Sequence, residues 1–219
     1  MFFANYGVFI HSLLKSYFNG ESNRDELVTR YLCDFKKNVI GNAPSVDIYV
    51  SFFTQGLEYI KHITKPEGKI LGVEERVDFC IEDHQFVGYI DLLNETVDRK
   101  IQLIDHKSRT LKPRSTRKKP TKTDMELDSY LRQLYLYSIP VHNKYGKYPD
   151  ELILNCYRSG VFIKEPFSQS KLDEAVQWAC DSINTICMET IWNPSIDYFK
   201  CKYLCELNKE CEYYQMAGG

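Results

Sequence analysis

The sequence predicts a mixed α/β domain built around a small sheet. The chain opens with apolar residues at helical spacing, changes near residue 69 to short runs rich in β-branched and aromatic residues, and then returns to helical spacing. With 219 residues, of which 43% are hydrophobic and 26% charged, the composition is that of a globular protein. A chain of this length buries roughly 70% of its unfolded surface, so it needs no disulfides to fold.

Three helices are expected first. Apolar residues recur at helical spacing from Tyr6 to Tyr17, where the run carries His11 and stops at Gly20. Two further helices are expected over residues 24–39 and 46–64.

Strands follow. The segments 69–81, 84–93 and 100–108 are short, rich in β-branched and aromatic residues, and separated by turn-like clusters, which predicts a three-stranded meander. A helix is then expected from Asp124 to Tyr145, with Pro140 kinking or ending it. The remaining expectations are a second hairpin over 151–157 and 160–167 and a last helix reaching about Glu189. We therefore expect one domain over 1–219, with N-terminal helices (1–66), a core (67–192) and a cysteine-rich tail (193–219).

Neither membrane insertion nor secretion is favoured by the sequence. No apolar run reaches the roughly 20 residues of a membrane span, and the first residues lack a basic leader and a small-residue cleavage site. The 8 cysteines are too sparse for a secreted disulfide scaffold. We therefore expect a cytoplasmic protein without a membrane partner, in which any grouped cysteines bind a metal or a cluster.

The net charge of -2 hides a strong asymmetry. Residues 107–122 hold eight Lys/Arg and no Asp/Glu, so this stretch carries +8 and the remainder -10. One concentrated basic strip in an acidic protein predicts a polyanion partner, with DNA the leading candidate, while a solvated basic linker is the alternative. The candidate DNA-binding residues are Arg109, Lys112, Arg114, Arg117, Lys118, Lys119 and Lys122.

Two carboxylates and a lysine lie at the ends of predicted strands. Asp91 ends one strand, and Asp105 and Lys107 share a face at the end of the next, while His106 points away from them. If the register brings Asp91 and Asp105 together, their hard oxygen ligands suit Mg²⁺ or Mn²⁺. A lysine beside such a metal can orient a water molecule and stabilise charge on a phosphate. A strand-end aspartate next to an ion-paired lysine is the structural alternative.

These motifs resemble the PD-(D/E)XK nuclease superfamily, in particular the RecB-type exonuclease branch with its CRISPR-associated spacer-acquisition exonucleases and phage relatives. The segments that carry the resemblance, in the order of that branch, are Gly7-Val-Phe-Ile-His11, Gly88-Tyr-Ile-Asp91, Leu103-Ile-Asp105-His-Lys107 and Gln133-Leu-Tyr-Leu-Tyr137. The resemblance extends over nearly the whole chain and implies a restriction-endonuclease-like core, with a small mixed central sheet flanked by helices and a cysteine-rich C-terminal tail.

The resemblance also implies roles for individual residues. By it, His11, Asp91 and Asp105 ligate the metal, Lys107 acts on the attacking water, and Gln133 and Tyr137 contact the substrate or brace the site. The branch often carries a glutamate on the first strand, where Glu74 and Glu75 both qualify by position. Adjacent strand residues point to opposite faces, so at most one belongs to the site, and Glu74 is favoured.

Cys201, Cys205 and Cys211 lie within eleven residues, which suggests iron-sulfur or zinc. In iron-sulfur members of the RecB-type branch, three such cysteines join one N-terminal cysteine to hold a 4Fe-4S cluster. The match departs in two ways: the first two cysteines are separated by three residues where two are expected, and no cysteine precedes Gly7. Cys33 or another cysteine substitutes, a segment is missing, or the three are ordinary reduced thiols.

The leading hypothesis is a metal-dependent DNA nuclease, with an exonuclease favoured over an endonuclease, that cuts DNA ends in recombination, repair or CRISPR adaptation, alongside proteins of those pathways. One alternative is a non-catalytic DNA-end-binding or recombination-accessory module, against which the intact set of Asp91, Asp105 and Lys107 argues. Another is a zinc-stabilised interaction protein built on the terminal cysteines.

Overall fold

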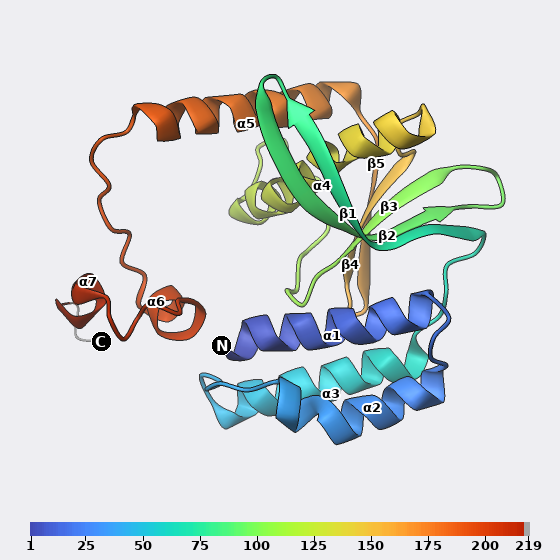
Figure 1. The fold of residues 1–219 in the computed structure, drawn as a ribbon, viewed down its shortest axis with the longest axis horizontal. Helices are drawn as coiled ribbons and strands as arrows, with labels where there is room; N and C mark the ends of the chain where they lie inside the picture. Colours follow the sequence, from blue (N-terminus) through green and yellow to red (C-terminus); the bar gives the residue numbers. More distant parts are fainter. Residues whose placement is uncertain (217–219) are drawn as a thin grey trace. The chain divides into compact units, whose positions relative to one another are not determined.

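A computed structural model describes residues 1–216, so the last three residues of the predicted tail lie outside the described part. The chain divides into two compact units (Figure 1). The first comprises Met1–Ile63 together with the chain from Glu189, and the second comprises Thr64–Met188. Within residues 1–216, every helix is too short or too polar to cross a bilayer.

The first unit opens with the three expected helices. They are α1 (Phe2–Phe18), α2 (Arg24–Asn38) and α3 (Val46–His62). Asn23 caps α2 in a capping box with Glu26, and the Ser45 side chain accepts a bond from the Ile48 amide at the start of α3. Both helices therefore begin at residues that satisfy their otherwise unpaired amide groups.

Aromatic side chains hold these three helices together. The rings of Tyr6 in α1 and Phe52 in α3 lie 4.8 Å apart, and those of Phe35 in α2 and Phe53 in α3 lie 4.9 Å apart. A side chain at Gly56 would lie 2.4 Å from the Tyr31 hydroxyl and 2.5 Å from that of Tyr6. Glycine at this position therefore lets the two tyrosines pack against the backbone of α3.

The C-terminal segment belongs to this same unit. It contains two short helices, α6 (Tyr198–Leu204) and α7 (Glu212–Met216). Helix α6 contacts α1, where the rings of Phe199 and Phe3 lie 6.0 Å apart. The two ends of the chain thus pack within one unit.

The second unit is built on a five-stranded mixed sheet in the order β1-β2-β3-β4-β5. The strands are β1 (Lys69–Ile81), β2 (His84–Glu95), β3 (Ile101–His106), β4 (Glu151–Cys156) and β5 (Val161–Pro166). The first three form an antiparallel meander and the last two a hairpin, as predicted, and β3 pairs with β4 in parallel. This mixed sheet with flanking helices confirms the predicted fold class.

Two helices pack on this sheet. Helix α4 (Lys122–Tyr145) connects the parallel strands β3 and β4, and α5 (Gln169–Met188) follows β5. Figure 1 shows the long β1–β2 hairpin (green) reaching α5 (orange), and the two elements are in contact. The buried core lies between sheet and helices, with residues such as Leu103 and Leu152 packed against Leu131 and Leu134.

Pro140 does not end α4, contrary to one of the two outcomes expected from the sequence. The helix continues to Tyr145 with Pro140 inside it. It ends where Gly146 adopts a left-handed conformation with φ of 71° and donates its amide to the His142 carbonyl at 2.8 Å. The glycine, which tolerates positive φ, thus sets the end of the helix.

Candidate active site

The sheet register brings Asp91 and Asp105 to one place. The last paired position between β2 and β3 is Leu92 with Ile104, and the two aspartates lie one residue beyond it on their respective strands. Residues directly opposite each other share a face of the sheet. The His106 amide donates to Asp91 Oδ2 at 2.7 Å, which fastens the end of β2 to that of β3. Both carboxylates are nearly enclosed, with exposed fractions of 9% for Asp91 and 5% for Asp105.

Lys107 lies beside Asp105, directly after β3. Its Nζ is 3.0 Å from Asp105 Oδ1 and 2.8 Å from Oδ2, and it donates to Gln133 Oε1 at 3.1 Å. The same ammonium lies 5.5 Å from the centre of the Tyr130 ring. The His106 ring lies on the other face, as strand alternation predicts, where its Nδ1 is 3.0 Å from Asn155 Nδ2.

Helix α4 supplies the next members of the site. Gln133 and Tyr137 are one turn apart on this helix, and Gln133 Nε2 donates to the Tyr137 hydroxyl at 3.0 Å. Gly88 lies beneath the tyrosine, because a Cβ at that position would be 2.5 Å from Tyr137 Cε1. The glycine of one sequence motif therefore makes room for the tyrosine of another.

Glu74 is the glutamate that lies next to Asp91. One of its carboxylate oxygens lies within 4.8 Å of one from Asp91. Its backbone has a φ of +48° inside β1, an uncommon conformation for a residue other than glycine. The carboxylate of Glu75, the other candidate, pairs instead with Lys144. Glu74 and Asp91 thus offer two hard oxygen ligands at a spacing that one divalent cation can bridge.

The other predicted metal-binding residues lie in the first unit. His11 is on α1 and is partly buried rather than enclosed. Cys201 is in α6, Cys205 directly follows that helix and Cys211 directly precedes α7. All three are partly buried thiols, while Cys33 on α2 is exposed. Among residues 1–216, the three sulfur atoms do not come within 4.8 Å of one another as a group.

The basic strip connects β3 to α4. Two of its arginines pair with acidic residues of the helix, Arg109 with Glu126 and Arg114 with Asp128, the latter at 2.5 Å. The remaining cationic candidates, Lys112, Arg117, Lys118, Lys119 and Lys122, are exposed. The strip therefore starts at Lys107 and ends at the first turn of the helix that carries Gln133.

Asp124 is the residue of this region that sequence reasoning missed. It is only 2% exposed, and its carboxylate accepts bonds at 2.7 Å from the amides and from the hydroxyls of Ser115 and Thr121. The backbone amides of Ser115 and Thr121 are the largest cause that lowers the pKa of Asp124 far below its ordinary value. The sequence does contain a local signal for Asp124, because Thr121 and Asp124 have the spacing of a capping box at the start of α4.

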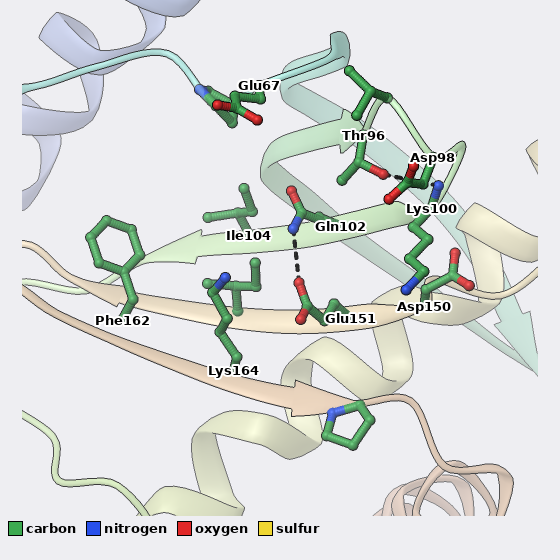
Figure 2. A pocket seen from close by; sticks show the side chains of 14 residues that line it. Glu67, Thr96, Asp98, Lys100, Gln102, Ile104, Asp150, Glu151, Phe162 and Lys164 are labelled. Carbon is green, nitrogen blue, oxygen red and sulfur yellow. Dashed lines mark hydrogen bonds between the residues drawn. The ribbon is translucent and has the colours of Figure 1, made fainter.

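A separate pocket of about 730 Å³ opens on the other face of the same sheet (Figure 2). Its walls include Gln102, Ile104 and Glu151, which alternate with the core residues Leu103 and Leu152 along their strands. Figure 2 shows the bond from Gln102 to Glu151, 2.8 Å long. The lining mixes acidic and basic side chains and contains none of the predicted site residues, so the carboxylate site is independent of this pocket.

A family model described as the PD-(D/E)XK nuclease superfamily matches residues 3–212, nearly the whole chain. A search of curated proteins found no match.

Proposed function

Because the chain belongs to the PD-(D/E)XK nuclease superfamily, we propose that it is a Mg²⁺- or Mn²⁺-dependent deoxyribonuclease whose chemistry takes place at Asp91, Asp105 and Lys107. Membership in the family supports metal-dependent, hydrolytic nuclease activity in general, with DNA as the substrate.

The observation that carries the proposal is a continuous set of contacts between motifs far apart in sequence. Lys107 bridges Asp105 on the sheet to Gln133 on α4, and Gln133 continues to Tyr137. This arrangement holds the lysine ammonium in one place at the end of β3. There it can orient a water molecule and stabilise negative charge that develops on a phosphate.

The acidic residues fit a divalent metal. Glu74 and Asp91 supply oxygen ligands close to each other, and by the family resemblance Asp105 and His11 would complete the set. Such a metal supplies a Lewis acid for the phosphate and lowers the pKa of a bound water. The residues of the chain position that water and the substrate.

We further propose that the enzyme is an exonuclease acting at DNA ends in recombination, repair or CRISPR adaptation, as the resemblance to the RecB-type branch suggests. The competing reading is a non-catalytic DNA-end-binding module. The ion pair of Lys107 with Asp105 fits either function, whereas its second contact, with Gln133 on α4, favours a working site because it fixes the ammonium in one place.

The test is a nuclease assay on end-labelled single- and double-stranded DNA and on circular DNA, with Mg²⁺, Mn²⁺ or excess chelator. We expect degradation of the linear substrates only, with a divalent cation, and loss of activity in Asp105→Asn. Asp98→Asn is the matched control, because Asp98 is exposed in the turn between β2 and β3 at the other end of the same strands. Activity in chelator, or a fully active and folded Asp105→Asn, would refute the nuclease. Cleavage of circular DNA would refute only the exonuclease.

A further inference from the structure

The most exposed part of the basic strip is a loop closed at its base by a single carboxylate. The Asp124 carboxylate accepts hydrogen bonds from the amide and the hydroxyl of Ser115 at one end of the loop. It accepts the same two kinds of hydrogen bond from Thr121 at the other end. The segment between them, Thr116 to Pro120, is exposed throughout and contains Arg117, Lys118 and Lys119. We call residues 115–121 the closed loop.

Asp124 belongs to the capping box of α4, and its carboxylate also joins the two ends of the loop. Burying a carboxylate is costly unless it is hydrogen-bonded, and here four donors compensate that cost. Those donors come from the two ends of one loop, so the bonds fix the distance between these ends. Three cations are thereby held next to one another on a short segment, against their mutual repulsion.

The closed loop is fixed relative to the catalytic helix. Asp124 is the third residue of α4, and Gln133 follows nine residues later on the same helix. At a rise of about 1.5 Å per residue, the base of the loop lies about 14 Å along the helix axis from Gln133. This distance corresponds to roughly four base pairs of duplex DNA at 3.4 Å each.

We propose that Asp124 is a positioning residue, which shapes residues 115–121 into a preformed cationic loop that binds backbone phosphates of DNA flanking the bond to be cut. This inference rests on the proposed nuclease function and adds the substrate contact that function requires. The loop reads no bases, because backbone phosphates carry no sequence information directly.

The loss of charge and the loss of loop shape in Asp124→Asn should have opposite effects on DNA binding. Asp124→Asn removes a negative charge, which by itself would tighten the binding of DNA. An asparagine, however, offers one acceptor oxygen where the carboxylate offers two, so the four donors cannot all be satisfied. If Asp124 acts by shaping the loop, the variant binds DNA more weakly despite its more positive charge.

The experiment measures the affinity of the full chain for a short DNA duplex as a function of salt, with Ca²⁺ in place of Mg²⁺ to limit cleavage. We expect the dissociation constant of Asp124→Asn to rise about fivefold or more, since disordered cations must be ordered on binding. The slope of the logarithm of affinity against the logarithm of salt concentration should become shallower by roughly 0.7 to 0.9 for each lost phosphate contact. It should approach the slope of the triple variant Arg117→Gln/Lys118→Gln/Lys119→Gln. Glu126→Gln is the matched control, because it removes one charge from the same helix without touching the base of the loop. It should bind DNA as tightly as the wild type or more tightly.

Two further readouts separate shaping of the loop from general loss of stability. Added to the triple glutamine variant, Asp124→Asn should weaken binding no further, because the cations it positions are gone. Trypsin should cleave after Arg117 and Lys118 faster in Asp124→Asn than in the wild type, with the rest of the chain equally resistant. Tighter binding by Asp124→Asn, an additive loss in the combined variant, or unchanged cleavage would each overturn the proposal. None of these measurements depends on catalysis, so a failed nuclease assay remains a distinct result.

Discussion

Gly88 shows how one residue without a side chain can be essential to a site. Its Cα lies beneath the ring of Tyr137, whose hydroxyl accepts from Gln133, the residue that in turn holds Lys107. The lack of a side chain at Gly88 therefore influences, through Tyr137 and Gln133, where Lys107 lies. The glycine is needed here for close approach rather than for backbone freedom.

Gly88→Ala should therefore reduce both stability and activity. The added Cβ would meet Tyr137 Cε1 at 2.5 Å, so the ring must move and its bond with Gln133 must weaken. We expect a loss of about 1 to 3 kcal/mol in the free energy of unfolding, as for overpacking elsewhere. Turnover should fall at least about tenfold because a small misplacement of a catalytic group is costly.

Chemical denaturation and steady-state kinetics of Gly88→Ala measure the two effects. Combining it with Tyr137→Ala, which removes the clashing ring, should restore the stability lost through the clash. Equal losses in the single and the combined variants would show that Tyr137 is not what the alanine meets.

At the scale of elements, the pairing of strand and helix gives the site its shape. Strand β3 ends at the site, the basic strip follows, and α4 returns with Gln133 and Tyr137. In a parallel strand–helix–strand arrangement such as β3–α4–β4, functional groups gather at the carboxyl ends of the strands. The carboxylate of Asp124 connects the basic strip to the helix, so the strength of this connection should depend on pH.

Asp124 should make the stability of the protein depend on pH in the acidic range. Its folded pKa is lowered from the ordinary value, so the ionised carboxylate stabilises the folded state. This contribution is complete above the unfolded pKa of about 3.9 and is lost as pH falls through the folded value. Melting of the wild type and of Asp124→Asn between neutral and acidic pH measures it. The gap between their melting temperatures should be widest near neutral pH and narrow below about pH 4. A gap that is constant with pH would contradict this reading.

Much of this architecture was readable from the sequence, for physical reasons. Short runs rich in β-branched and aromatic residues, separated by turn-like clusters, predicted the strands, and the places of Asp91, Asp105 and Lys107 at two strand ends predicted that these residues would meet. The close packing of Gly88 under Tyr137 was not readable, because it depends on the crossing of a strand and a helix far apart in sequence. The left-handed backbone of Glu74 was equally hidden, since no local preference favours it for glutamate.

At the scale of the whole molecule, the chain folds into units that do not follow its order. The first unit joins the opening helices to the C-terminal segment, and the sheet and its two helices form the second. Hydrophobic periodicity reports only local structure, so it could not predict that Phe199 would pack near Phe3. The predicted cysteine centre belongs to this unit.

We expect the three terminal cysteines to bind a structural metal centre rather than a catalytic one. Sulfur ligands suit soft or borderline metals, and the thiols lie in the first unit, whereas the carboxylates lie in the second. A centre of this kind should stabilise the packing of α6 on α1. Cys205→Ser should then lower the melting temperature of anaerobically purified protein and reduce its iron or zinc content. Cys187→Ser, at an exposed cysteine of α5, is the control. Metal-free wild-type protein with unchanged melting in Cys205→Ser would leave the cysteines as ordinary thiols.

The positive φ of Glu74 affects which substitutions evolution would accept at this position. Its φ of +48° suits glycine better than glutamate, at a cost of about 1 kcal/mol or more. Glu74→Gly should therefore melt at an equal or higher temperature than the wild type while losing its metal-dependent activity. Without demand for catalysis, random substitution would drift towards glycine here, since the folded state gains by it. A lineage that had turned this fold into a purely binding module would be recognisable by that one exchange.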